Sequence, residues 1–300
     1  MNKVVVVGCG NVGMAYAFAL LNQDTKVDEL ILIDIDNKKA LGNAMDLSHT
    51  LLFSKSKIKV KAGSYADCKD AKIVVIAAGA NQKPNETRLE LVNRNNKILK
   101  EVVNKTVSSG FEGIFLVATN PVDIMAYMTK KYSKFPSSRV IGSGTILDTS
   151  RLAFLLSERL KVSYEDVHAY VLGEHGDSSF VSWSNAKAGV IDIENIISKP
   201  DLKQIEEKVR KQAYKIIDYK GETSYGIGVC LTEITRAILN NEHKVLPVSV
   251  NYDGLYLGMP AVINEKGIKG VMRIKLNAEE TKKLEKSKNI LKQIIKDLEE

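Results

Sequence analysis

The chain has 300 residues, of which 44% are hydrophobic and 26% are charged, and its formal net charge is +7. This length is enough for a large core divided between two packed domains, and no apolar run reaches the roughly 18 residues that a transmembrane helix needs. The basic excess is scattered and is not interleaved with aromatic residues, which argues against nucleic-acid binding and for a solvated basic surface.

The three cysteines, Cys9, Cys68 and Cys230, are isolated and odd in number. They provide no metal-ligand pair and are compatible with a reducing compartment. The valine run at 4–7 is too short, and too soon followed by glycines, to be a signal peptide. We therefore expect a cytoplasmic protein with no metal site.

The first 140 residues alternate short apolar strands with helices. Continuous apolar strands between helices indicate a parallel sheet that is covered on both faces. Residues 1–143 are therefore expected to form a doubly wound, Rossmann-type α/β domain. The predicted strands are 4–7, 29–36, 58–63, 72–79 and 113–120, and the predicted helices are 12–21, 38–47 and about 86–108.

The second half has a different pattern, and residues 144–300 are expected to form an α+β domain. Asn277 and Glu280 make a capping box for a final helix with an apolar face. The other predicted helices are about 145–160, 201–219 and 224–240, and the predicted strands are 167–173, about 245–250 and 271–275.

A glycine-rich stretch, GCGNVG, places Gly8, Gly10 and Gly13 between the first strand and the first helix. In the dinucleotide fingerprint these positions allow a tight turn, the approach of a pyrophosphate and close packing of helix on strand. Asp34 lies at the end of the next predicted strand, where a carboxylate binds both ribose hydroxyls and repels a 2′-phosphate. A plain glycine-rich turn beside a surface aspartate is the alternative, but the βαβ context favours NAD.

His175 lies in the stretch GEHGDSS at the end of a predicted strand. Such a histidine can act as a base, although most isolated histidines have no chemical role. Asp148 and Arg151 are three residues apart on a predicted helix and share one face. They could be a solvated ion pair, yet this helix is rich in apolar residues, and buried charges need partners.

Together these motifs resemble those of the lactate/malate dehydrogenase family. They follow the family's order and spacing over the whole chain, which is far more specific than any single motif. The resemblance implies reversible hydride transfer between L-lactate and NAD⁺, giving pyruvate and NADH. The segments that carry it are GCGNVG with Asp34, AGANQKPNETRLELVNRN, VATNPVDI, TILDTSR, GEHGDS and KGETSYGIG.

The resemblance also implies a role for each polar residue of the site. His175 would exchange the hydroxyl proton, and Asp148 would orient its imidazole and offset its charge. Arg151 would bind the substrate carboxylate with a two-pronged fork, and Arg88 would polarise the reacting carbonyl. Asn120 would contact the substrate oxygen and the nicotinamide side, next to an expected cis bond to Pro121.

Two further residues have structural alternatives. Thr223 would lie near the substrate methyl, or it could be the N-cap of the helix that follows. Ile227 would press on the nicotinamide ring, or it could be ordinary core. The residues implied to bind the nucleotide are Gly8, Gly10, Val12, Gly13, Asp34, Gly79, Asn120 and Ile227.

The choice of substrate depends on Gln82, because malate-type members of the family carry an arginine there. A dicarboxylate enclosed beside a neutral glutamine would lack a partner for its second charge, at a cost of about 3–5 kcal/mol. A monocarboxylate such as pyruvate is therefore expected. The alternatives are a malate or branched-chain L-2-hydroxy-acid dehydrogenase and, outside enzymes, an NAD-binding sensor without turnover.

The resemblance implies a homotetramer, or a dimer. Many bacterial relatives bind fructose 1,6-bisphosphate through an arginine and a histidine. Here His168 matches the histidine, but Ala153 stands in place of the arginine. Loss of a bidentate phosphate ligand weakens such a site, so we expect little or no activation by this effector.

Overall fold

The structure is a computed structural model that describes residues 1–80 and 88–299, and only the backbone at Arg88. The strands of its large sheet are β1 (Lys3–Val7), β2 (Glu29–Ile33), β3 (Lys59–Ala62), β4 (Ile73–Ile76), β5 (Ile114–Val117), β6 (Val140–Gly142), β12 (Lys244–Tyr252), β13 (Leu255–Asn264) and β14 (Gly267–Val271). The α-helices are α1 (Asn11–Asn22), α2 (Asn37–His49), α3 (Arg88–Ser108), α4 (Val122–Ser133), α5 (Ile146–Leu160), α6 (Lys199–Lys220), α7 (Tyr225–Leu239) and α8 (Ala278–Glu299).

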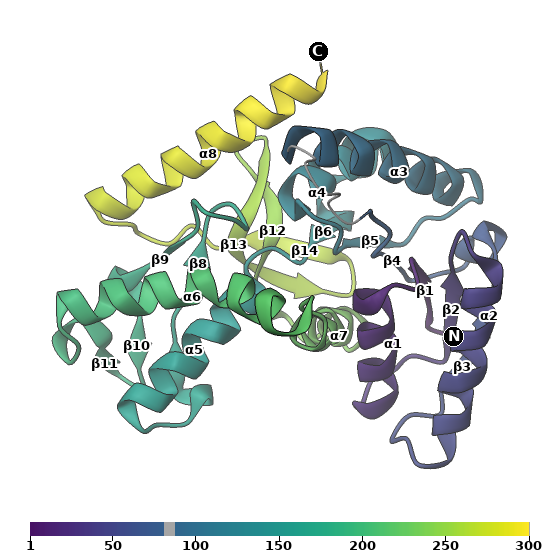
Figure 1. Ribbon diagram of the computed structural model, residues 1–300, viewed down its shortest axis with the longest axis horizontal. Helices are drawn as coiled ribbons and strands as arrows, with labels where there is room; N and C mark the ends of the chain where they lie inside the picture. The colour runs from purple at the N-terminus through teal and green to yellow at the C-terminus, as the bar shows by residue number, and fades with distance from the viewer. Residues whose placement is uncertain (81–87, 300) are drawn as a thin grey trace.

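Among the described residues, the large sheet has the strand order β14-β13-β12-β6-β5-β4-β1-β2-β3 (Figure 1). Within the part of the sheet that runs from β6 to β3, every neighbouring pair of strands is parallel. Every residue of β1, β2, β4 and β5 is buried, because helices cover both faces of the sheet. The predicted doubly wound α/β fold is confirmed.

The second half adds α5, α6 and five short strands, and it has a core of its own. The short strands are β7 (Val167–His168), β8 (Val171–Leu172), β9 (Phe180–Val181), β10 (Lys187–Ala188) and β11 (Ile191–Asp192). Leu152 and Leu156 of α5 pack there with Leu202 and Ile205 of α6. By contrast, α7, α8 and β12–β14 join the main core with the N-terminal strands. No helix in the described ranges is both long and apolar enough to cross a membrane.

Two predicted strands are wrong in the structure. The expected strand at 167–173 is two short strands, because β7 pairs with β10 while β8 pairs with β9. The expected strand at 271–275 is absent, since β14 ends at Val271 and the Ile274 N–H turns back to the carbonyl of Met272 at 3.1 Å. The long strand β13 was not predicted at all.

The β12–β13 hairpin continues the sheet beyond β6. Asp253 and Gly254, with φ angles of 53° and 86°, form its two-residue turn, as an Asp-Gly pair favours. Gly258 interrupts the apolar pattern of β13. A glycine is needed at this position, because a Cβ there would lie 2.4 Å from the Thr145 hydroxyl oxygen. β12 is antiparallel to β6 through Ser249 and Gly142. This junction is close-packed.

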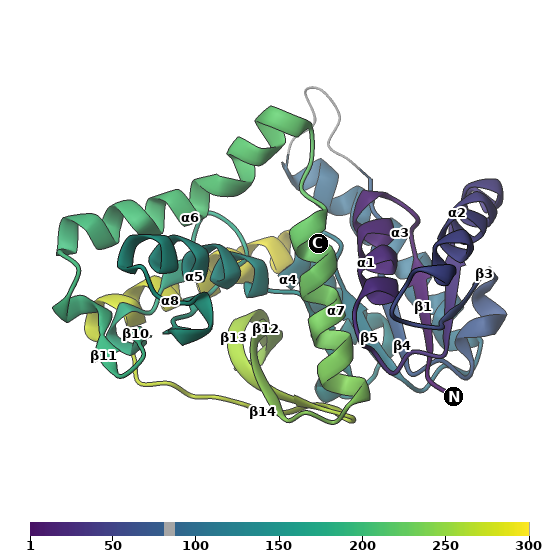
Figure 2. The same cartoon turned by 90° about the horizontal axis from the view of Figure 1, so that it is seen from below.

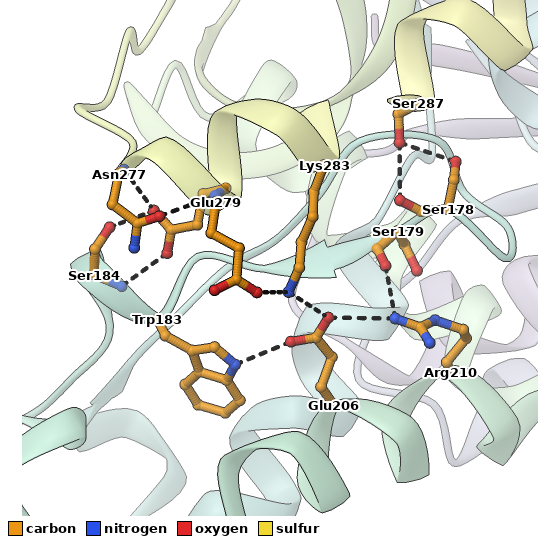
Figure 3. Close-up of polar contacts among 11 residues, drawn as sticks. Ser178, Ser179, Trp183, Ser184, Glu206, Arg210, Asn277, Glu279, Lys283 and Ser287 are labelled. Atoms are coloured by element: carbon orange, nitrogen blue, oxygen red, sulfur yellow. Dashed lines mark hydrogen bonds and ion pairs between the residues drawn. The ribbon is translucent and has the colours of Figure 1, made fainter. Parts of the chain in front are cut away.

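The capping box of α8 is confirmed. The Glu280 N–H donates to Asn277 Oδ1 at 2.9 Å, and the Asn277 N–H donates to Glu280 Oε2 at 3.0 Å. Glu280 is only 3% exposed and also accepts the Ser184 N–H at 2.9 Å. The start of α8 is thereby tied to the segment that follows β9, as Figure 3 shows for Asn277 and Ser184.

Helices α1 and α7 lie against each other between the two halves (Figure 2). Tyr16 and Thr235, both fully buried, share a hydrogen bond of 2.7 Å across this contact. Gly228 allows the close approach, because a Cβ there would lie 2.6 Å from the carbonyl carbon of Ala15.

Substitution of Gly228 by alanine should therefore destabilise the protein by about 1–3 kcal/mol, the usual cost of overpacking. The measurement is urea unfolding at equilibrium. Gly42→Ala in exposed α2, where a Cβ meets nothing within 4 Å, is the matched control and should be neutral or stabilising by up to about 1 kcal/mol. Equal effects at both positions would show that the α1–α7 contact is not close-packed.

Candidate active site

A cavity of about 430 Å³ opens where α3, α5, α6 and the segments after β5 and β8 meet. It is concave and has several polar groups, as ligand sites do. Its lining is Leu91, Val92, Asn120, Pro121, Asp148, Arg151, His175, Gly176, Asp177, Ser179, Arg210, Ala213 and Tyr214.

The structure brings His175, Asp148 and Arg151 together in the wall of this cavity. His175 Nδ1 lies 2.7 Å from Asp148 Oδ2, and Arg151 Nη1 donates to Asp148 Oδ1 at 2.9 Å. Each oxygen of the carboxylate thus has its own cationic or ring partner. Because Nδ1 faces Asp148, Nε2 is the nitrogen of His175 left for proton exchange with a ligand.

The charges of these groups determine their protonation. Burial alone would lower the pKa of His175, but the carboxylates of Asp148 and, to a smaller extent, Asp123 together outweigh burial and raise the pKa to about 9. For Asp148, burial would raise the pKa, and the charges of His175 and Arg151 lower it instead. Because the pKa of His175 exceeds its usual 6.5, the pair stabilises the fold fully below about pH 6.5 and loses this contribution as the pH rises through about 9.

Gly173 turns the chain from β8 towards His175. Its φ is 91°, which favours glycine, and a Cβ there would lie 2.6 Å from Ser287 Oγ. Gly173 also exchanges two backbone hydrogen bonds with Gly258, of 3.0 and 2.8 Å. The segment that carries His175 is thereby fixed to β13.

Ser287, on the buried face of α8, holds the same segment from a second direction. Its hydroxyl donates to the Ser178 carbonyl at 2.9 Å and accepts the Glu174 N–H at 3.2 Å. Sequence reasoning missed this residue. The sequence does contain one indication of its role, because Ser287 is a polar residue on the same helical face as the apolar Leu284 and Leu291.

Arg210 was also missed, and it fixes the far end of the segment. Its Nη2 donates to the Ser179 carbonyl at 3.2 Å and to Glu206 Oε1 at 3.3 Å. Glu206 in turn accepts from Trp183 Nε1 at 3.0 Å and pairs with Lys283 at 3.3 Å (Figure 3). A network of charges from α6 and α8 therefore supports the cavity wall.

The Asn120–Pro121 peptide bond is cis, as expected. Asn95 supports it by donating from Nδ2 to the Asn120 carbonyl at 3.0 Å. Asn95 Oδ1 accepts the Ala80 N–H at 2.8 Å. The ends of β4 and β5 are thus linked beside the cavity.

The glycine-rich loop has the geometry of a phosphate cradle. Gly8 has a φ of 107°, and a Cβ there would lie 2.6 Å from Ala78 N, while a Cβ on Gly13 would lie 2.0 Å from the Gly8 carbonyl oxygen. A Cβ on Gly10 would meet nothing within 4 Å. Two glycines therefore permit backbone packing, whereas the third leaves open space beside the N-terminus of α1.

Asp34 lies against this loop. Its Oδ2 accepts the Cys9 N–H at 2.7 Å and its Oδ1 accepts the Asp36 N–H at 3.0 Å. A carboxylate has further lone pairs for ribose hydroxyls, so these residues fit a dinucleotide. Val12 and Ile227 are half-buried against the main core, and Gly79 follows β4.

The remaining predicted residues are not all in the same cavity. Thr223 lines a neighbouring cavity of about 400 Å³ that shares Arg151 with the first. It is not a helix N-cap, since Ser224 holds that position and donates to Glu222 at 3.0 Å. Gln82 and the side chain of Arg88 lie outside the described residues. Across residues 1–80 and 88–299, no cluster of three His, Cys, Asp or Glu side chains could hold a metal ion.

Known proteins resemble this chain over almost its full length. Residues 2–142 match the lactate/malate dehydrogenase NAD binding domain, and residues 145–300 match the alpha/beta C-terminal domain of the same family. An L-lactate dehydrogenase from Geobacillus sp. (strain WCH70) is 51% identical, over 98% of this chain and 96% of its own.

Two solved structures have nearly the same fold as this chain. A lactate dehydrogenase from a Medee basin deep-sea metagenome library has a TM-score of 0.97 and 51% identity, over 100% of this chain and 99% of its own. The minor L-lactate dehydrogenase from Enterococcus mundtii, in its ligands-bound form, has a TM-score of 0.97 and 40% identity, over 99% of this chain and 98% of its own.

The raised pKa of His175 can be tested without any ligand. In an NMR titration of the imidazole Cε1–H signals, the His175 signal should change near pH 9. Asp148→Asn should move it to lower pH, because the amide keeps the size of the side chain but not its charge. His175→Asn identifies the signal. An unchanged midpoint in Asp148→Asn would show that the carboxylate does not set the pKa.

Proposed function

The chain belongs to the lactate/malate dehydrogenase family, and we propose that it is an NAD-dependent L-lactate dehydrogenase, which interconverts L-lactate and pyruvate. The observation that carries the proposal is the Asp148 carboxylate held between His175 at 2.7 Å and Arg151 at 2.9 Å in a cavity wall. L-lactate dehydrogenase is also the name of the relative from Geobacillus that is 51% identical.

NAD would lie along the glycine-rich loop, with its pyrophosphate in the open space beside Gly10 and its ribose hydroxyls on Asp34. When bound, it supplies the nicotinamide ring that accepts or returns the hydride. Val12, Gly79 and Ile227 would complete its surroundings. The neighbouring glycines, Gly8 and Gly13, keep strand and helix close enough for this approach.

His175 would take the hydroxyl proton of L-lactate at Nε2 and return it to the alkoxide formed from pyruvate. Asp148 holds Nδ1 and offsets the imidazolium charge, the role a carboxylate has in catalytic triads. Since the pKa of His175 is about 9, the proton donor needed for pyruvate reduction predominates at neutral pH. Lactate oxidation, which needs the neutral ring, is favoured as the pH rises.

Arg151 would bind the substrate carboxylate. Only its Nη1 contacts Asp148 among the described ion pairs, and a guanidinium has five N–H donors. The others can make a bidentate fork. Arg88 would polarise the reacting carbonyl, Asn120 would contact the same oxygen, and Thr223 would lie towards the methyl group.

Gln82 would select a monocarboxylate, because a neutral side chain leaves a second substrate carboxylate unpaired. A malate or branched-chain L-2-hydroxy-acid dehydrogenase is the alternative within the family, and an NAD-binding sensor is the alternative outside enzymes. A homotetramer is the proposed assembly. Ala153 and the exposed His168 predict little or no activation by fructose 1,6-bisphosphate.

The proposed function is tested by NADH oxidation with pyruvate, oxaloacetate and 2-ketoisocaproate side by side. Pyruvate should give the highest kcat/KM. A higher value with oxaloacetate or 2-ketoisocaproate would identify one of the alternative dehydrogenases, and no rate with any of the three would favour the sensor.

His175→Asn should reduce turnover of pyruvate by about 10²- to 10⁴-fold, because it removes the proton donor, and should leave NADH binding unchanged. Initial rates and NADH fluorescence titration measure the two effects. His243→Asn is the matched control, since His243 is exposed and has a φ of 52° that asparagine tolerates. If both variants kept wild-type rates, another group would exchange the proton.

Gln82→Arg should raise the ratio of kcat/KM for oxaloacetate to that for pyruvate by at least about tenfold, which corresponds to 1.4 kcal/mol. The reason is that the arginine pairs with the second carboxylate. Gln82→Met, which changes the side chain without adding charge, should leave the ratio near its wild-type value. A similar shift in both variants would mean that charge at this position does not select the substrate.

A further inference from the structure

Asp123 is a buried carboxylate that none of the steps above uses. It lies in the first turn of α4 and is 2% exposed. Its Oδ2 accepts the backbone N–H of His175 at 2.7 Å, and its Oδ1 accepts the Ser249 hydroxyl at 2.5 Å. Three separate parts of the chain, α4, β12 and the segment after β8, therefore meet at one side chain.

Both of these hydrogen-bond donors are neutral, which makes the charge costly. Burial raises the pKa of Asp123 to about 6, although the bonds from Ser249 and His175 act in the opposite direction. The carboxylate is thus ionised at neutral pH in a site that disfavours its charge. Its place in the first turn of α4 offsets only part of that cost.

The charged groups around this position come from several elements. Asp148 and Arg151 of α5 act on the His175 ring, and Glu174 beside His175 raises the pKa of Asp123. From β12 the neighbour is the neutral Ser249. Burial and Asp148 have the largest effects on the pKa of His175. The negative charge of Asp123 has a smaller effect, which favours the protonated form of His175.

We propose that Asp123 is a positioning residue for His175, which fixes the backbone of the proton-exchanging histidine and adds a second carboxylate charge that favours its imidazolium. This inference rests on the proposed dehydrogenase function. It also explains why an expensive buried charge is present where an amide of the same shape would make the same contacts. Stability is exchanged for a histidine that stays protonated to higher pH.

Asp123→Asn separates charge from geometry. Asparagine can accept the His175 N–H at its oxygen, and its amide can donate to the Ser249 hydroxyl, which accepts as well as donates. Both hydrogen bonds are therefore retained while the charge is lost. The variant tests the electrostatic half of the proposal directly.

The experiment measures kcat/KM for pyruvate with NADH against pH, which reports the ionisation of the enzyme form that binds pyruvate. In wild type, the rate should fall on the alkaline side as His175 loses its proton, with a pKa of about 9. In Asp123→Asn, this alkaline fall should occur at lower pH. NADH binding should stay unchanged.

Urea unfolding provides a readout that does not depend on activity. The folded-state pKa of Asp123, about 6, lies above its usual 3.8. Ionisation of Asp123 therefore costs stability as the pH rises from about 4 through 6. Asp123→Asn should gain stability relative to wild type over this range and keep the gain above it.

Glu280→Gln is the matched control, because Glu280 is an equally buried carboxylate whose partners are Ser184 and Asn277. In Glu280→Gln, the fall in kcat/KM on the alkaline side should occur at the same pH as in wild type. If kcat/KM of Asp123→Asn falls at the same alkaline pH as that of wild type, or if this variant fails to fold at neutral pH, the inference is wrong. If wild type itself does not reduce pyruvate, the proposed function fails instead.

Discussion

One carboxylate, Asp148, joins the two side chains on which the proposed chemistry depends. Its two oxygens bind different partners, His175 Nδ1 and Arg151 Nη1. A single charge therefore orients both the ring that we propose exchanges a proton and the guanidinium that we propose binds the substrate carboxylate. Because both partners are cations when protonated, the carboxylate also keeps two positive charges close together in a site that is largely withdrawn from water.

The rest of the fold holds that interaction in place. The segment that carries His175 is bound to β13 through Gly173, to α8 through Ser287 and to α6 through Arg210. None of these contacts contributes chemistry by itself. Their combined effect is preorganisation, since a group proposed to act in catalysis from an otherwise irregular segment needs several independent supports to stay within a few tenths of an ångström.

Much of the nucleotide domain could be predicted because its signals are local. A run such as Val4–Val7 and the spacing of Gly8 and Gly13 act within a few residues of one another. The second half was harder, because its elements depend on distant partners. β13 contains Gly258, and a glycine in a sequence argues against a strand. Only the structure shows that Thr145 occupies the space where a side chain of residue 258 would lie.

The candidate site shows the same division. His175, Asp148 and Arg151 belong to motifs that can be identified in the sequence, and the structure brings these residues within hydrogen-bond distance. Ser287 is 112 residues from His175 by numbering, and nothing near it in the sequence marks its role. Sequence reasoning also treated Thr223 as a possible N-cap, but the helix begins one residue later than that requires.

The continuity of the large sheet across the two halves has a mechanical consequence. β12 is joined to β6 at Ser249 and Gly142, and a Cβ on Gly144 would lie only 2.2 Å from Ser249 N. The two halves are thus closely packed where their strands meet. One continuous sheet therefore joins the two halves, and cutting the chain at the boundary would leave β6 and β12 as unpaired edges that invite aggregation.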